Sequence, residues 1–350
     1  MTQILDHAAT DEPDFDQAES DLPEIDAEMS REEYFETLRA LSKASAEHYF
    51  NAFVDIDWSH PDFAIDPTDE RWVLPEIDTI GGSDWYKSQP LDKQIKIGQW
   101  RQANIMKVGV QFENLLIRGI MMYTFKTPNG NPEFRYLMHE ATEECHHNQM
   151  FQEGVNRIGY EVPGMPWILR KLGNTIASTA SWGPMAFFIA VLAGEEPIDH
   201  TQKSILRAGE DMHPMIQRIM QIHVAEEARH ISFAHAYITR HAQTLSWAER
   251  QWIAFLFPII MRIAGDAILV APKQMRKEFD IPKSVIKDLY WKSPEARVRL
   301  SEVFADVRML AEEAGLMTTL SRRVWKLLKI DGRPNRYRSE PSTVFTEKAA

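Results

Sequence analysis

The sequence predicts an all-α protein organised around an antiparallel bundle of long helices. Apolar residues recur at spacings of three and four through long segments, which is the pattern of a helix with one buried face. No strand-like alternation of useful length occurs between these segments. Short connections between long helices force neighbours to run antiparallel. The long helices are predicted over residues 91–126, 133–158, 174–195, 198–240, 245–271 and 294–315.

Two further segments precede the bundle. Residues 31–49 predict an amphipathic helix, in which Tyr34, Leu38 and Leu41 share one face. Residues 51–90 are rich in proline, aspartate and glycine, and they predict an extended irregular segment. Because no internal repeat at a fixed period is present, we expect a single helical domain over residues 31–330.

Charge is distributed very unevenly along the 350 residues. The formal net charge is -12, yet residues 1–28 hold ten acidic residues and no lysine or arginine, which leaves 41 acidic against 39 basic residues elsewhere. The folded body is therefore nearly neutral, and no basic footprint for nucleic acid exists. Residues 1–30 predict an acidic disordered tail, with a docking segment for a basic partner as the alternative. Residues 331–350 predict a C-terminal tail.

The compartment is predicted from cysteine content and hydropathy. With Cys145 as the single cysteine, no intrachain disulfide can form. The N-terminus lacks the basic and apolar sequence of an export signal, so we expect a cytoplasmic protein. Apolar runs such as Ile253 to Met261 are ended by Arg262 and Asp266 before they could cross a bilayer, so no membrane span is expected.

Histidines gather in the segments predicted to form the bundle core. Nine of the twelve lie between residues 139 and 241. In the run His223-Val-Ala-Glu-Glu-Ala-Arg-His230, helical rotation places Glu227 about 40° from His223 and His230 about 20° to the other side. One stripe therefore presents imidazole, carboxylate and imidazole, which is half of a metal site. A surface stripe of hydrogen-bonded polar residues is the alternative, and the apolar flanking residues argue against it.

A second segment, Glu143-Glu144-Cys145-His146-His147, also places a carboxylate and an imidazole one helical turn apart. Either Glu143 pairs with His146 or Glu144 pairs with His147, and the spacing does not choose between them. This segment is a candidate for the other half of the site.

Two more positions hold carboxylates in apolar surroundings. Glu113 is the only charged residue between Lys107 and Arg118. Burying an ionised carboxylate there costs roughly several kcal/mol of folding free energy unless a nearby cation compensates the charge. The pair Glu195-Glu196 ends the uncharged run 182–194, and a surface turn at Pro197 is the alternative for that pair.

The combined set matches a known site design. One glutamate from each of two helices and a Glu-x-x-His from each of two others hold a dinuclear metal site in a four-helix bundle. Carboxylates with a few imidazoles suit iron or manganese, and the absence of a cysteine pair argues against structural zinc.

These residues resemble the ferritin-like diiron proteins, and most closely the para-aminobenzoate N-oxygenase (AurF-like) branch, from about Trp100 to His241. The branch is marked by a Glu, then Asp/Glu-Glu-x-x-His, a further Glu, and His-x-x-x-Glu-x-x-His. The third imidazole, His223, separates it from ribonucleotide reductase radical subunits, soluble methane monooxygenases and acyl-carrier desaturases. The resemblance selects Glu144 with His147, and Glu196 over Glu195. The ligands that it implies are Glu113, Glu144, His147, Glu196, His223, Glu227 and His230.

The resemblance implies a ferritin-like four-helix bundle with additional flanking helices. It also implies O2 activation at two iron ions, with manganese as a substitute in one or both positions. The reaction would convert an aromatic amine through a hydroxylamine towards a nitro group, with electrons from a separate reductase and no catalytic side chain beyond the ligands. The alternatives are a diiron hydroxylase or oxidase of an aliphatic or acyl substrate and, less favoured, a metal-storage or ligand-binding bundle. The large apolar helix surface further suggests a homodimer.

Supporting residues are less well defined by the sequence. A substrate carboxylate would call for an arginine, and the late helices offer several without choosing among them: Arg262, Arg297, Arg299 and Arg308. His200 could line the cavity. Asp199, Asp211 and Glu226 are candidates to hold ligand imidazoles in position.

Overall fold

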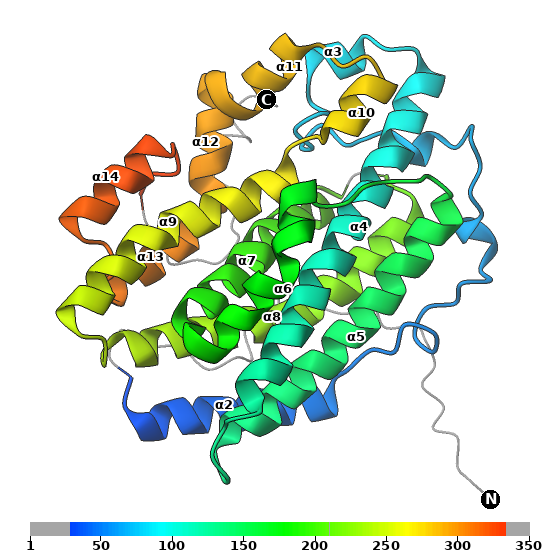
Figure 1. The fold of residues 1–350 in the computed structure, drawn as a ribbon. Helices are drawn as coiled ribbons and strands as arrows, with labels where there is room; N and C mark the ends of the chain where they lie inside the picture. The colour runs from blue at the N-terminus through cyan, green and yellow to red at the C-terminus, as the bar shows by residue number, and fades with distance from the viewer. Residues whose placement is uncertain (1–28, 210, 334–350) are drawn as a thin grey trace, which may run out of the picture.

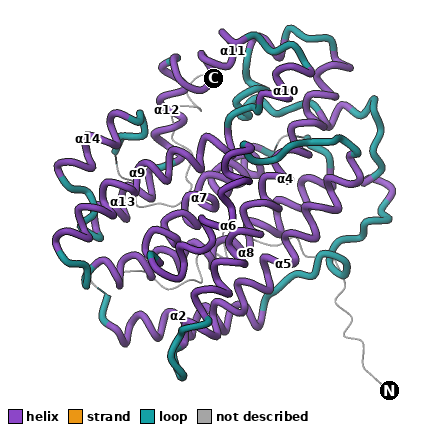
Figure 2. Tube along the Cα trace, in the orientation of Figure 1, coloured by secondary structure: helices purple, strands orange, loops and turns teal. Residues whose placement is uncertain are grey.

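The computed structural model describes residues 29–209 and 211–333. Within these ranges the chain forms helices and connecting loops and contains no strand (Figures 1 and 2). The all-α prediction is confirmed. The predicted N-terminal tail lies outside the described residues except for Met29 and Ser30, and the predicted C-terminal tail does so except for residues 331–333.

Four long helices form the centre of the molecule. They are α4 (Leu91–Thr124), α5 (Pro132–Ile158), α7 (Pro184–Ala208) and α8 (Pro214–Ala242). Helix α4 packs on α5, and α7 packs on α8, while the α5–α8 and α4–α7 contacts close the bundle (Figure 1). The connections agree with known helix-end preferences: Asn131 caps α5 ahead of Pro132, and α7 ends at Gly209 with a φ of 63°.

Other helices flank this bundle. Helix α2 (Arg31–Glu47) starts in a capping box between Ser30 and Glu33 and crosses α5 and α8 at one end (Figure 1). Helix α6 (Trp167–Trp182) packs on α4 and α7, and α9 (Trp247–Leu269) packs on α7. The ferritin-like bundle with flanking helices therefore agrees with the prediction.

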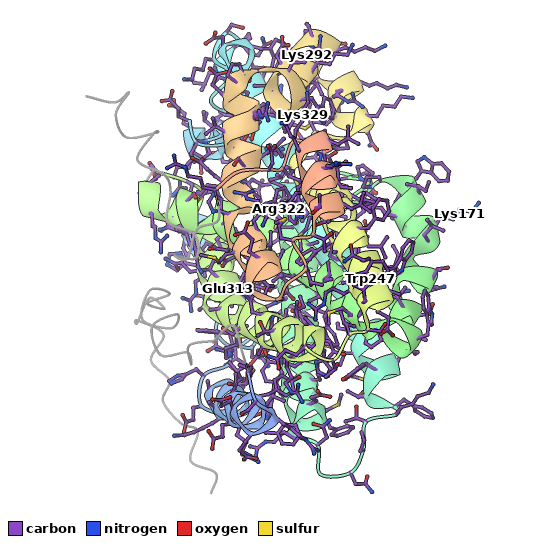
Figure 3. All side chains as sticks on the ribbon, turned by 90° about the vertical axis from the view of Figure 1, so that its left-hand side faces the viewer. Lys171, Trp247, Lys292, Glu313, Arg322 and Lys329 are labelled. Atoms are coloured by element: carbon purple, nitrogen blue, oxygen red, sulfur yellow. The ribbon has the colours of Figure 1, made fainter. Side chains whose placement is uncertain are left out.

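The C-terminal part of the described chain forms shorter helices. They are α10 (Lys273–Glu278), α11 (Lys283–Lys287), α12 (Pro294–Val303), α13 (Ala305–Glu313) and α14 (Thr319–Leu327). Figure 3 views the face formed by α12, α13 and α14 and labels Arg322 of α14. Arg322 forms an ion pair of 2.9 Å with Glu312 of α13. The single helix predicted over residues 294–315 is thus divided at Phe304.

The predicted boundaries around Pro197 are wrong. Instead of helices over 174–195 and 198–240, the chain breaks at Gly183 and at Gly209, and Pro197 lies inside α7. A proline within a helix removes one backbone hydrogen bond. The cost is offset because residues on both sides of Pro197, including Leu192 and Ile205, are buried in the core. As a consequence, the Glu195-Glu196 pair lies in the middle of a buried helix and not at a turn.

The segment between α2 and α4 is irregular, as predicted, but well packed. It contains the 3-10 turns Pro61–Phe63 and Glu70–Trp72 and the short helix α3 (Asp84–Lys87). Trp58 and Trp72 are buried in a cluster with Met106 of α4 and Met150 of α5. This segment therefore covers one side of the four-helix bundle.

Helix α9 bears on the expectation that no segment spans a membrane. By length and composition alone, the stretch Trp247–Glu278 qualifies as one candidate span among the described residues, and 56% of its most apolar window is buried inside the structure. Ala254, Phe257 and Met261 of α9 lie in the core between α7, α8 and the C-terminal helices. Such burial is what a core helix shows.

Candidate metal centre

Seven buried side chains from the four central helices converge in two adjoining groups. The first contains Glu113 of α4, His147 of α5 and His223 of α8. The second is formed by four residues of α5, α7 and α8: Glu144, Glu195, Glu227 and His230. Within each group, one potential ligand atom of every residue lies within 4.8 Å of all the others. This arrangement fits two metal ions.

Two carboxylates link the groups. Glu144 lies 3.4 Å from Nδ1 of His147 and 2.9 Å from Nδ1 of His230. The Oε1 atom of Glu227 lies 3.2 Å from Nε2 of His223, 3.7 Å from Nδ1 of His147 and 3.6 Å from Nδ1 of His230. Both carboxylates therefore face both groups, as bridging ligands of two neighbouring ions would.

Each imidazole is held from outside the cluster by an oxygen acceptor. Nε2 of His147 lies 2.8 Å from Glu226, Nε2 of His230 lies 2.8 Å from Glu143, and Nδ1 of His223 lies 2.8 Å from Oε1 of Gln202. The acceptor at each outer nitrogen favours a proton there, so in the neutral imidazole the lone pair is on the inner nitrogen. The three inner nitrogens point at the carboxylates and are available to bind metal.

The two Glu-Glu-x-x-His segments support each other reciprocally. Glu143 of α5 holds His230 of α8, and Glu226 of α8 holds His147 of α5. Buried Arg229 bonds Glu143 at 2.9 Å and lies 3.6 Å from Glu226, so one guanidinium neutralises both outer carboxylates. The backbone N–H of Phe50 also donates to Glu226. The segment after α2 thereby helps to fix the site.

Burial and mutual charge shift the pKa values within the cluster. Burial, reinforced by neighbouring carboxylates, raises the pKa of Glu113 and that of Glu195 well above the ordinary range. For Glu144 burial acts in the same direction, but His230 and His147 outweigh it and lower the pKa. Burial lowers the pKa of His223 to about 4, so this imidazole is neutral near pH 7. The raised pKa values of Glu113 and Glu195 mean that their ionised forms are disfavoured without a counter-charge, and a cation bound at the centre would supply that counter-charge.

The unsatisfied atoms test whether metal ions fit. Several buried atoms that face the centre have no hydrogen-bond partner among the described residues: both oxygens of Glu144 and of Glu195, Oε2 of Glu113 and of Glu227, and Nδ1 of His147 and of His230. Buried polar atoms without partners are costly and need an explanation. Two ions with a preference for oxygen and imidazole ligands would satisfy them, and iron and manganese have that preference.

The structure places one residue of the predicted ligand set outside the two groups. Glu195, not Glu196, joins Glu144, Glu227 and His230. Glu196 lies 2.8 Å from Nε2 of His235, outside both groups. Because successive helical residues are rotated by about 100°, only one of the pair can face the centre. The structure brings the other six predicted residues together: Glu113, Glu144, His147, His223, Glu227 and His230.

Sequence reasoning missed a further buried carboxylate. Glu140 of α5 is 0% exposed and lies one turn before Glu144, and within residues 29–209 and 211–333 neither of its oxygens has a hydrogen-bond partner. Burial raises the pKa of Glu140 to about 8, against the opposing effect of His230. The spacing of four residues between Glu140 and Glu144 was the available signal, because it places both on one helix face.

Among the candidates for supporting residues, Glu226 does hold an imidazole. Asp199 instead forms a buried ion pair of 3.0 Å with Lys203, and Asp211 is exposed. His200 lies on the wall of a second cavity, away from the cluster.

A cavity of about 70 Å³ adjoins the cluster. Glu113, Glu144, Glu195, His223 and Glu227 line its inner end. The remaining wall is apolar except for two amides, Gln102 and Gln202. A substrate in this cavity would lie directly beside the candidate ligands.

None of the four candidate arginines lines this cavity. Arg262 pairs with Asp266 at 3.0 Å, and Arg297 lies 3.4 Å from Asp331. Arg308 donates to the carbonyl of Ile330. Arg299 lines the second cavity, together with Arg101 and His200.

A four-helix bundle with this interior defines a ferritin-like protein with a candidate dinuclear carboxylate and histidine site. Residues 31–315 match the family described as P-aminobenzoate N-oxygenase AurF, and the chain belongs to this family. Similar proteins include uncharacterized proteins of Mycobacterium tuberculosis (strain CDC 1551 / Oshkosh) and Mycobacterium bovis. Each is 54% identical over 309 residues, which cover 88% of this chain and 91% of the relative. No solved structure matches the chain.

Proposed function

We propose that this protein is a non-haem diiron oxygenase that uses O2 to oxidise the nitrogen of an aromatic amine through a hydroxylamine towards a nitro group. The main support is the pair of adjoining groups that Glu144 and Glu227 link. Membership of a family described as an N-oxygenase supports the reaction type. The proposed ligands are Glu113, Glu144, His147, Glu195, His223, Glu227 and His230.

Two iron ions would supply the redox chemistry with O2. The chain would hold them through inner nitrogens of three imidazoles and through carboxylates that span both positions. The outer acceptors, Glu143, Glu226 and Gln202, retain one proton on each imidazole and fix its orientation. The apolar wall of the cavity excludes water from the substrate, so the reacting nitrogen meets few competing nucleophiles.

A second candidate reaction is hydroxylation or oxidation of an aliphatic or acyl substrate at the same site. The predominantly apolar wall of the cavity favours it, because hydrocarbon groups fit such a lining without a polar partner. A storage bundle is less favoured, because this cavity beside the cluster provides space for an organic substrate.

Single-turnover chemistry tests the proposal. Protein loaded anaerobically with ferrous iron is mixed with O2 and an excess of an aromatic amine, and the products are identified by mass spectrometry with 18O2. We expect hydroxylamine and nitro products that carry label from O2. Labelled alcohols from alkyl substrates, with no oxidised amine, would favour the second reaction, and unlabelled or absent products would contradict both.

Predictions about partners and location also remain proposals. We propose a separate reductase as the electron donor, because the family's chemistry consumes electrons and the assigned residues include no further redox group. We also propose a homodimer, because α6 and α9 expose large apolar side chains: Trp167, Ile168, Trp182, Trp252 and Ile263. Light scattering of the purified protein at several concentrations would test the dimer. The cytoplasmic location stays a prediction from the single cysteine.

A further inference from the structure

The cavity beside the candidate metal centre is elongated along the bundle. On α4, Gln102, Met106, Gly109 and Glu113 all line it. The eleven residue steps from Gln102 to Glu113 span roughly 16 Å at the rise of an α-helix, and these four residues lie on one helix face. On α8, the lining residues run similarly from Ile216 to Glu227. The space therefore extends well beyond the length of a single aromatic ring.

The charge of the wall is as informative as its shape. Among the described residues, none of those that line this cavity is a lysine or an arginine. The ionisable residues of the wall are all in the metal-binding cluster at the inner end. A carboxylate at the outer end would lose its hydration and gain no cation there, which is strongly unfavourable.

One outer polar group is free to recognise a substrate. Gln102 is 7% exposed and lines the cavity, and the part of the chain that the structure describes provides no hydrogen-bond partner for its side chain. Gln202, the other amide, is already engaged with His223. An amide that faces a mainly apolar cavity favours a ligand that offers it a hydrogen bond.

The nearest arginines belong to a different space. Arg101 and Arg299 line the second cavity, which shares no lining residue with the first. Arg101 is bonded to Asp78 at 2.7 Å, and Arg299 donates to the carbonyl of Leu289. Neither guanidinium is therefore available to an anionic group beside Gln102.

From these observations, and resting on the proposed function, we infer that the substrate is an elongated, uncharged and mainly apolar amine, with a hydrogen-bond acceptor away from the reacting nitrogen that bonds the Gln102 amide. A carboxylated amine such as 4-aminobenzoate is a poor ligand. Gln102 is thus a specificity-determining residue in the outer part of the cavity.

Calorimetric binding to anaerobic, ferrous-loaded protein tests this inference with a matched ligand pair. Methyl 4-aminobenzoate and 4-aminobenzoate carry the same amine and differ in charge. We expect the ester to bind at least tenfold more tightly. Extending the ester from methyl to butyl should raise affinity about three- to fourfold per methylene, the ratio expected when a methylene is buried.

The role of Gln102 is tested with Gln102→Leu, which keeps the side-chain size. We expect a five- to tenfold loss in affinity for the butyl ester, and little change for 4-butylaniline, which has no acceptor for the amide. Gln99→Leu is the matched control, because Gln99 is buried on the same helix but is absent from the cavity wall. Circular dichroism melting would verify that both variants fold.

Three outcomes would overturn the inference: equal or tighter binding of 4-aminobenzoate, an affinity that ignores ester length, or a Gln102→Leu variant that binds both ligand types like the wild type. If 4-aminobenzoate binds tightly and the Arg299→Ala variant loses this binding, the second cavity holds the carboxylate. If the expected binding preferences are found but no oxidised amine forms after addition of O2, this inference stands. The proposed N-oxygenation is then contradicted instead.

Discussion

His230 on α8 and Glu143 on α5 are joined by a 2.8 Å contact between Nε2 and Oε2. Glu226 on α8 makes the equivalent contact to His147 on α5. Each Glu-Glu-x-x-His segment thus provides the outer partner for the imidazole of the other. The order of atoms is carboxylate, imidazole and metal position, an arrangement that fixes ligand geometry in many metalloproteins.

Replacing an outer carboxylate should therefore weaken metal binding without removing a ligand. We expect Glu143→Gln to lower iron affinity about 10- to 100-fold, the range found for such outer partners. Competition with a chelator would measure it. Glu161→Gln, at an exposed position, is the control. An unchanged affinity in Glu143→Gln would mean that the 2.8 Å contact does not orient His230 for binding.

His223 should matter for one of the two positions only. It belongs to the group with Glu113 and His147, and its inner Nε2 atom lies 3.5 Å from Glu113. We expect His223→Ala to reduce bound iron from about two per chain to about one, measured by elemental analysis after desalting. His200→Ala, on the wall of the second cavity, should retain the wild-type content. Full loading of His223→Ala would remove His223 from the proposed ligands.

Glu140 gives a prediction for pH dependence in the metal-free protein. Its pKa in the fold, about 8, lies above the ordinary value, so the stability that it contributes is complete below about pH 4.5 and is lost as pH rises towards 8. Relative to the wild type, Glu140→Gln should gain on the order of 3 kcal/mol of unfolding free energy between pH 5 and pH 8. Urea unfolding at both values would measure this gain.

The control for that experiment is Glu161→Gln, whose difference from the wild type should not vary with pH. A pH-independent difference for Glu140→Gln would show that Glu140 is ionised in the fold at pH 5 and has a charged partner.

Gly109 tests the close packing around the cavity. A Cβ atom at this position would lie 2.7 Å from the ring of Phe151, which also lines the cavity. We expect Gly109→Ala to lose about 1–3 kcal/mol of stability, as overpacked cores do, and to weaken ligand binding while iron content stays the same. Thermal melting and calorimetry would separate the two effects. Wild-type ligand affinity would show that Phe151 moves without changing the cavity.

The helical bundle and most of the cluster were predictable from the sequence. Helical spacing alone aligns His223, Glu227 and His230, and an isolated acid such as Glu113 in an apolar helix stands out. Both patterns involve residues that are close together in the sequence, so they can be recognised without the tertiary structure. The choice between Glu143–His146 and Glu144–His147 required the family resemblance.

The choice between Glu195 and Glu196 was beyond local reasoning. Their spacing to other motifs depends on where the helices break, and Pro197 suggested a break that tertiary packing overrides. Which of two adjacent residues faces the interior depends on the rotation of α7 against α8. The partner of Glu196 is His235, which lies 39 residues away, and no sequence pattern predicts this contact.

Iron-loaded wild-type protein, compared with Glu195→Gln and Glu196→Gln, tests the central claim most directly. We predict close to two iron ions per chain in the wild type and in Glu196→Gln, with a Mössbauer spectrum of two ferric ions coupled through shared carboxylates. Glu195→Gln should lose at least one of these ions. Fewer than two ions in the wild type, two uncoupled ions, or a loss confined to Glu196→Gln would contradict the account.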